Sequence, residues 1–140
     1  MAIDDLGKTL LISASGMRAQ SVRMRVIAEN LANADTVGLK PGDEPYRRKV
    51  VTFADELDRA TGAETVRVKS VGRDQSEFGS RFDPGHPAAD PAGYVRTPNV
   101  NMLVEVNDMR QAQRTYEANL NVVDSARSMM MRTIDLLRSS

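Results

Sequence analysis

Apolar residues recur every seven positions at both ends of the chain. The N-terminal repeat extends from Ile3 to Leu31, and the C-terminal repeat extends from Met109 to Leu137. A period of seven places side chains on one stripe of an α-helix, as in coiled coils. The sequence therefore predicts a long amphipathic helix at each end, with the two packed as a coiled-coil-like pair. At about 30 to 35 residues and a rise of ~1.5 Å per residue, each helix would be roughly 45 to 50 Å long.

A second apolar row accompanies each stripe. It is interrupted by Ser13 and Gln20 in the first helix and by Gln113 and Arg127 in the second. Helices stabilised mainly by packing need a partner that covers such a stripe, so we predict that both stripes are assembly interfaces. In the N-terminal helix the predicted interface residues are Ile3, Leu6, Leu10, Met17, Met24, Ile27 and Leu31. In the C-terminal helix they are Val106, Met109, Tyr116, Leu120, Val123, Met130, Ile134 and Leu137.

The middle of the chain changes from helical to extended patterns. Residues 46–53 and 64–71 are rich in Val and Thr, and Val66 and Val68 alternate with polar neighbours. Such alternation is typical of a half-exposed strand in a small antiparallel sheet. Residues 54–60 are interpreted as a helical turn. The predicted fold class is therefore α+β, with two long terminal helices and a small β-containing insertion.

Residues 79–98 are rich in Gly, Pro and Asp and predict a long loop. The order Asp-Pro-Gly-His at residues 83–86 indicates a type II turn, which requires a positive φ at Gly85, and residues 90–93 fit a type I turn. Asn99 or Asn101 would then cap the C-terminal helix. A loop of about 20 residues in a compact domain is more often a contact surface than a simple connection. We predict loop contacts at Asp83, Pro84, Gly85, His86 and Pro87.

These patterns divide the chain into three parts. Residues 1–36 form the N-terminal helix, residues 37–98 form the β-containing middle segment with its loop, and residues 99–140 form the C-terminal helix. The two helical parts are expected to form one domain together, with the middle segment as an insertion.

Composition limits the size of the core and the class of partner. Aromatic residues make up 4% of the chain, Trp is absent and eight residues are Met, which predicts a thin or shared core. The 19 basic and 19 acidic residues balance, which argues against nucleic-acid binding. Without cysteine, the chain has no disulfide or thiolate chemistry. The N-terminus has no apolar run of the kind found in secretory signals, so we expect a cytosolic protein or export without a cleaved signal.

No group of residues in the sequence has the spacing of a catalytic site. His86 is the single histidine, and metal or general-base sites usually need a second ligand or a converging carboxylate. The basic run at residues 47–49 is interpreted as the solvated face of a strand. We therefore expect a protein that is not an enzyme, with no cofactor, no metal and no small-molecule substrate.

Two segments near the N-terminus resemble the signature of flagellar rod and hook proteins. They are residues 14–20, with the sequence ASGMRAQ, and residues 27–40, with the sequence IAENLANADTVGLK. Asn side chains compete with helical backbone bonds, and Gly38 permits a conformation closed to other residues, so the helix is expected to end and the chain to reverse there. The signature residues are Asn30, Leu31, Asn33, Thr36 and Gly38.

Within that family, further segments resemble the proximal rod proteins. They include YRRKVVTF at residues 46–53, FDPGHPAAD at residues 82–90 and TPNVN at residues 97–101. Leu39 stands where an aromatic residue is common in the family, and residues 62–79 carry little of the resemblance.

The resemblance implies a structural subunit exported through the flagellar type III apparatus into the basal-body rod, which spans the periplasm and transmits torque. Its implied partners are copies of itself, other rod proteins, and basal-body ring and export-gate components. The terminal helices would form the inner tube and the middle segment would face outward. Two alternatives remain: another rod or hook protein of the same family, and a soluble coiled-coil adaptor.

Overall fold

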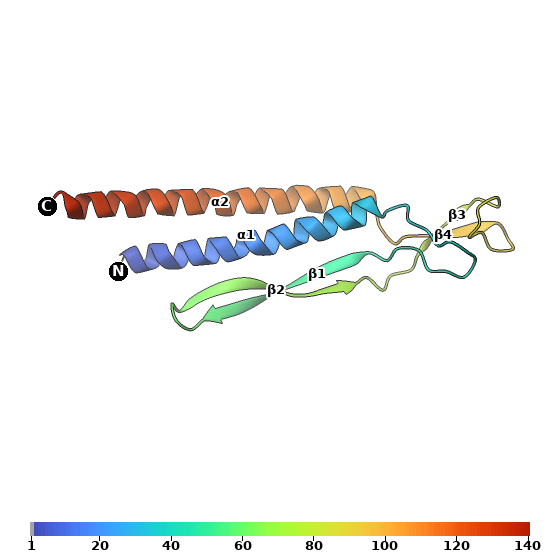
Figure 1. Ribbon diagram of the computed structural model, residues 1–140, viewed down its shortest axis with the longest axis horizontal. Coiled ribbons are helices and arrows are strands. Elements are labelled where there is room, and N and C mark those ends of the chain that lie inside the picture. The colour runs from blue at the N-terminus through green and yellow to red at the C-terminus, as the bar shows by residue number, and fades with distance from the viewer. Residues whose placement is uncertain (1) are drawn as a thin grey trace. The chain divides into compact units, whose positions relative to one another are not determined.

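The computed structural model describes residues 2–140 and has a helix at each end of the chain (Figure 1). The elements in order are α1 (Ala2–Ala32), β1 (Lys49–Asp58), β2 (Ala63–Arg73), β3 (Gly79–Phe82), β4 (Tyr94–Thr97) and α2 (Met102–Arg138). The strands form two separate two-stranded sheets, β1–β2 and β3–β4. The α+β class with long terminal helices is confirmed.

Side-chain hydrogen bonds fix the C-terminal end of α1 and the N-terminal end of α2. Asn101 Oδ1 accepts hydrogen bonds from the N–H groups of Leu103 (3.1 Å) and Val104 (3.3 Å), so Asn101 is the N-cap of α2. After α1 ends, Asn33 Nδ2 donates to the Glu29 carbonyl at 2.8 Å. Asn33 thus satisfies one of the last carbonyls of the helix, as expected for an Asn that bonds back to the backbone.

The β1–β2 hairpin is longer than the sequence pattern indicated. The predicted helical turn at residues 54–60 is wrong, because β1 continues to Asp58. There the Asp58 carboxylate accepts the backbone N–H groups of Ala60 (2.9 Å) and Thr61 (3.3 Å), and Gly62 has a φ of 74°. This local turn chemistry reverses the chain directly from one strand into the next.

The two ends of the predicted loop at residues 79–98 pair with each other as the strands of a β-hairpin. β3 pairs antiparallel with β4, with Gly79 opposite Thr97 and Phe82 opposite Tyr94. The Phe82 and Tyr94 rings meet edge to face with centroids 5.2 Å apart. Cross-strand aromatic pairs of this kind stabilise a short sheet.

Two glycine predictions need correction. The His86 N–H donates to the Asp83 carbonyl at 3.1 Å, so residues 83–86 do form a turn. However, the positive-φ glycines in residues 2–140 are Gly42, Gly62 and Gly93. Gly85 is therefore not in the conformation that a type II turn requires, and Gly38 is not left-handed either. A second turn closes at Ala89 N–H to His86 carbonyl (3.0 Å), and such consecutive turns need only negative φ values.

Two compact units make up the chain, and both helices contribute to each. Unit 1 contains α1 up to Arg23, Thr52–Ser70 of the β1–β2 hairpin, and Gln111–Ser140. Unit 2 contains Met24–Val51 and Val71–Arg110, and thus the β3–β4 hairpin.

In unit 1, α1 and α2 run antiparallel and approach closely. Arg23 Nη2 donates to Gln111 Oε1 at 3.1 Å, and Gly16 lies against Asn119 so tightly that a Cβ would meet Asn119 Nδ2 at 2.7 Å. Ser15 Oγ connects α1 to the hairpin, because it accepts the Val66 N–H at 3.1 Å. Among residues 3–140, the buried apolar residues of this unit are alanines: Ala19, Ala63, Ala112 and Ala126. The core is as thin as the composition predicts.

The side of α2 that is covered within the subunit matches only one of its two predicted rows. Covered positions alternate by four and three residues and include the predicted Met109, Tyr116, Val123 and Met130. Their companions are Ala112, Asn119, Ala126 and Thr133, whereas Leu120 and Ile134 of the predicted second row are exposed. Small side chains permit close helix approach, as the contact of Gly16 with Asn119 shows. The small or polar companion residues therefore occupy the covered side where larger apolar residues were expected.

Candidate functional site: junction network and exposed stripes

A buried polar network in unit 2 joins both helices to the start of β1. Its centre is Asn30, which has 1% of its surface exposed. Asn30 Oδ1 accepts hydrogen bonds from Tyr46 Oη (2.8 Å) and the Lys49 N–H (2.9 Å). Asn30 Nδ2 donates to the Lys49 carbonyl (3.0 Å) and to Glu105 Oε2 (3.3 Å). These four bonds use the whole capacity of a side-chain amide.

Glu105 of α2 supplies the buried charge of this junction network. Its carboxylate has no exposed surface and accepts a hydrogen bond from Arg48 Nε. The Arg48 guanidinium also lies 3.4 Å from Asp74 Oδ2 and 3.7 Å from Asp108 Oδ2. Burial works against the charge, but the hydrogen bond to Glu105 and the nearby carboxylates raise the pKa of Arg48. A buried carboxylate paired in this way is a fixed connection between strand and helix.

Two further side chains extend the network to the end of β2. Asn99 Oδ1 accepts the Arg48 N–H at 2.7 Å, and Asn99 Nδ2 donates to the Asp74 carbonyl at 3.0 Å. The Ser76 N–H donates to Asp74 Oδ1 at 2.8 Å and lowers the pKa of Asp74. Asn99 thus connects segments and does not cap the helix.

The network has a more exposed edge at Lys49 and Tyr46. Lys49 Nζ donates to Glu29 Oε2 at 2.9 Å, which lowers the pKa of Glu29. Burial raises the pKa of the Tyr46 hydroxyl, which donates to Asn30.

The remaining signature residues build the chain reversal after α1. Thr36 Oγ1 donates to Asn33 Oδ1 at 3.1 Å, and the Thr36 carbonyl accepts the Tyr46 N–H at 3.0 Å. Gly38 lies so close to Asp43 that a Cβ would be 2.6 Å from the Asp43 Cβ. A glycine is needed at this position because of close approach and not because of its φ angle. Leu31 is half-buried.

Large apolar side chains are exposed on two further sides of α2 in unit 1. One group includes the predicted Leu120 and Ile134. The other consists of Val122, Met129 and Leu136, spaced by seven residues. Because residues seven apart share one side of a helix, we call this second group the outer stripe. The predicted Leu137, at the end of α2, is also exposed.

The predicted interface residues of α1 are mostly covered within the subunit. Ile3 is exposed, and Ile27 is buried. The others are half-buried: Leu6, Leu10, Met17, Met24 and Leu31. On α2, Val106 is half-buried as well.

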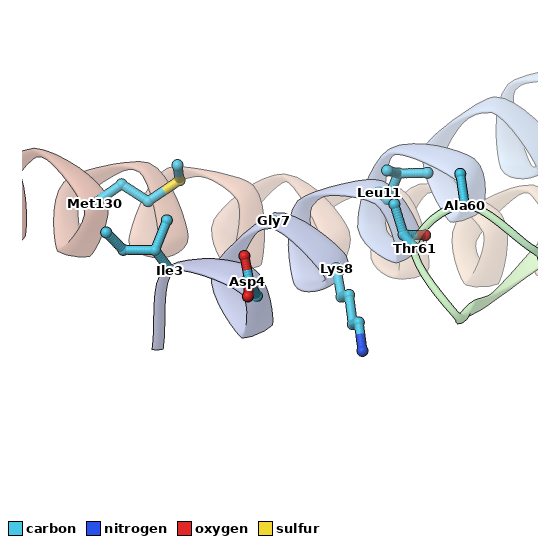
Figure 2. Close-up of a pocket in the computed structure, with 8 residues that line it drawn as sticks. All are labelled: Ile3, Asp4, Gly7, Lys8, Leu11, Ala60, Thr61 and Met130. Atoms are coloured by element: carbon cyan, nitrogen blue, oxygen red, sulfur yellow. The ribbon is translucent and has the colours of Figure 1, made fainter. Parts of the chain in front are cut away.

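An open hollow of about 560 Å³ lies in unit 1 beside the first turns of α1. Figure 2 shows Ile3 next to Met130 of α2 at one side of it, and Leu11 near Ala60 at the other. Gly7 opens the floor of the hollow, because a Cβ there would meet nothing within 4 Å. Its lining mixes these apolar side chains with the polar residues Asp4, Lys8 and Thr61, so the hollow has no single chemical character.

The five predicted loop-contact residues differ in exposure. Pro84, Gly85 and Pro87 are exposed, whereas Asp83 and His86 are half-buried. His86 Nδ1 accepts the Ala88 N–H at 3.0 Å, so its ring holds the loop in shape. Within residues 2–140, no group of three or more His, Cys, Asp or Glu side chains is placed to hold a metal. In the same part of the chain, neither helix is long and apolar enough to cross a membrane.

Comparison with known proteins matches both ends of the chain and then its whole length. A model described as flagella basal body rod protein matches residues 10–40, and one described as flagellar basal body rod FlgEFG protein C-terminal matches residues 92–136. The flagellar basal-body rod protein FlgC of Agrobacterium fabrum is 49% identical over 138 residues, which cover 99% of each chain. The chain belongs to the FlgC family. The FlgC proteins of Salmonella typhimurium (42% identical over 127 residues, 89% of this chain and 92% of that one) and Bacillus subtilis (35% over 143 residues, 91% and 95%) are also similar.

Membership in the FlgC family confirms the resemblance seen in the sequence. The chain is a structural subunit of the flagellar basal-body rod. Asn30 is recognisable in the sequence only through the family resemblance, and no local pattern indicates that Glu105 contacts both Asn30 and Arg48 or that Asn99 contacts Arg48. Glu105 stands one position before a predicted apolar residue, Val106, and a pattern of apolar spacing gives no signal for a buried charge.

Proposed function

We propose that the chain assembles helically through its terminal helices and so forms part of the rod's drive shaft and export channel. α1 and α2 would pair in a coiled-coil-like manner as the inner-tube domain, residues 1–36 with 99–140, and residues 37–98 would face outward. The neighbours would be copies of itself, other rod proteins, and basal-body ring and export-gate components. Family membership supports a place among rod components.

The observation that carries this proposal is the apolar character of α2 on three sides. One side, with Tyr116 and Val123, is covered within the subunit. The other two present Leu120 and the outer stripe, where Leu136 is 72% exposed. A helix that packs against one partner needs a single apolar stripe. The extra apolar sides of α2 therefore fit a helix surrounded by neighbouring subunits.

Loop residues 83–87 would contact neighbouring subunits, beside Phe82 and Tyr94, which are both partly exposed. The rod would span the periplasm, and the subunit would reach it without a cleaved signal peptide. Its role would be mechanical, with no catalysis, cofactor, small-molecule substrate or nucleic acid.

The test compares exposed and covered positions of the same helix. Leu120→Asp should change the free energy of unfolding of the isolated subunit, measured by thermal unfolding, by no more than about 0.5 kcal/mol, because Leu120 is already 39% exposed. In a strain that depends on this chain, it should abolish rod incorporation and motility, since a carboxylate would be buried between helices. Val123→Asp should unfold the subunit itself, and Glu117→Lys is the control for charge. Normal swimming with Leu120→Asp would refute the proposal.

A further inference from the structure

A shallow groove of about 440 Å³ in unit 2 has a cationic and aromatic lining. It is formed around Phe78, with Arg47 and Arg96 on its walls. The Arg47 Cζ lies 4.2 Å and the Arg96 Cζ 4.8 Å from the centroid of the Phe78 ring. We call this feature the Phe78 groove. Glu77 also lines it, so two guanidinium groups and one carboxylate leave a net positive charge.

The two arginines differ in what they bind within the subunit. Arg47 Nη1 donates to the carbonyls of Asp74 (2.9 Å) and Ser76 (3.3 Å), and Arg47 Nη2 lies 3.8 Å from Glu44. The Arg96 side chain contacts the Phe78 ring but has no hydrogen bond or ion pair with the residues that the structure describes. A guanidinium held on an aromatic ring is pre-oriented for a bidentate carboxylate. The Phe78 groove therefore suits an acidic side chain with an apolar neighbour.

β1 of the same chain carries a segment with this chemistry. Asp55 and Leu57 lie two residues apart in β1, so they share one face of the strand. Asp55 is exposed and has no ion pair with any described residue, and Leu57 is 58% exposed. Glu56 between them faces the opposite side.

We infer that the Phe78 groove of one copy binds the Asp55–Leu57 face of a second copy. The Asp55 carboxylate would accept hydrogen bonds from Arg96, and Leu57 would pack against Phe78. Because two different surfaces meet, the contact is heterologous and adds copies without closing a pair. The inference rests on the proposed self-assembly and names one contact within it.

The experiment is a charge exchange, read by sedimentation of the full chain at increasing concentration. Arg96→Asp and Asp55→Arg should each weaken self-association about tenfold, because each places like charges together. A one-to-one mixture of the two variants should restore it, since every aspartate then meets an arginine. Arg81→Asp, an exposed arginine on β3, and Glu56→Arg, on the other face of β1, should have little effect.

The outcomes separate this contact from assembly in general. If Leu120→Asp abolishes self-association while the exchanged charges have no effect, the helical proposal stands and this contact is wrong. If Arg96→Asp weakens association but the mixture does not recover, the Phe78 groove binds another acidic surface, which also overturns the inference. A chain that does not self-associate up to its solubility limit contradicts it as well, and the helical proposal is then judged by motility.

Discussion

The Arg48 guanidinium donates a hydrogen bond to Glu105, a carboxylate with no exposed surface, across 57 positions of sequence. Arg48→Met would leave this charge buried with only the Asn30 amide as a side-chain donor. We expect a loss of about 3–5 kcal/mol in the free energy of unfolding, the usual cost of breaking a buried pair. Urea unfolding of the purified subunit measures this loss.

The matched control removes both charges. Arg48→Met combined with Glu105→Leu should be less destabilising than Arg48→Met alone, because an apolar pair replaces an unpaired buried charge. Simple addition of the two single effects would show that the residues do not act as a pair.

Two glycines of α1 should respond differently to alanine. At Gly7 the new Cβ meets nothing within 4 Å, so Gly7→Ala should stabilise the subunit by about 0.5–1 kcal/mol through helix propensity. At Gly16 the Cβ would meet Asn119 Nδ2 at 2.7 Å, and the clash should cancel this gain. Thermal unfolding of both variants, together with Gly16→Ala/Asn119→Ala, measures the difference. Equal stabilisation at both positions would contradict the close approach of the helices.

The loop glycines provide a second matched pair. Gly93 has a φ of 91°, and a Cβ there would lie 2.8 Å from Phe82 Cε2. Gly93→Ala should therefore cost about 1–3 kcal/mol. Gly85→Ala should change stability by less than about 0.5 kcal/mol, because Gly85 has no positive φ and open space around its Cα. A larger cost at Gly85 than at Gly93 would refute this account of the turn.

Acid should weaken unit 2 through two carboxylates. The hydrogen bond from Lys49 lowers the pKa of Glu29 below its ordinary 4.5, and the Ser76 N–H lowers the pKa of Asp74 below its ordinary 3.8. A lowered folded-state pKa stabilises the fold above the unfolded pKa, and this contribution disappears as the pH falls through the folded pKa. The melting temperature should thus fall as the pH drops below about 4.5.

Variants of the same carboxylates check the cause of the acid effect. Glu29→Gln and Asp74→Asn should each lower the melting temperature at neutral pH, and the difference from the unmodified chain should shrink as the pH falls through the lowered folded-state pKa values. Asp55→Asn, which removes a carboxylate that has no ion pair within residues 2–140, is the control. A constant difference from neutral to acid pH would show that the substitutions act through packing.

The sequence allowed prediction of the elements whose signal is local and repeated. The seven-residue apolar period located both helices, and the valines of residues 64–71 located β2. The β3–β4 hairpin was not predicted because Gly79, Ser80 and Arg81 have no strand-like alternation, and because its pairing depends on partners about 15 positions away. The helical turn expected at residues 54–60 was wrong because Asp58, and not the preceding residues, determines where the chain turns.

The candidate site was predictable only in part, for a similar reason. Leu120 and Ile134 were found because they are large and periodic. The companion row on the covered side of α2 contains Ala112, Asn119, Ala126 and Thr133, whose small or polar side chains give a weak hydropathy signal. Arg48 and Glu105 pair over a distance in sequence that no local pattern records. Asn30 was recognisable from the family signature, but its three partners, Tyr46, Lys49 and Glu105, required the fold.

Asn30 and Glu105, which share a hydrogen bond in the junction network, are 75 residues apart in the chain. Closing so long a segment has an entropic cost that is recovered only when both ends are present. During synthesis, α1 therefore emerges well before the residues that complete its polar contacts. The N-terminal part of a partly synthesised chain would therefore not reach its final structure until α2 is present. Such late folding would suit the proposed export of the subunit, because a structure completed early would obstruct passage through a narrow channel.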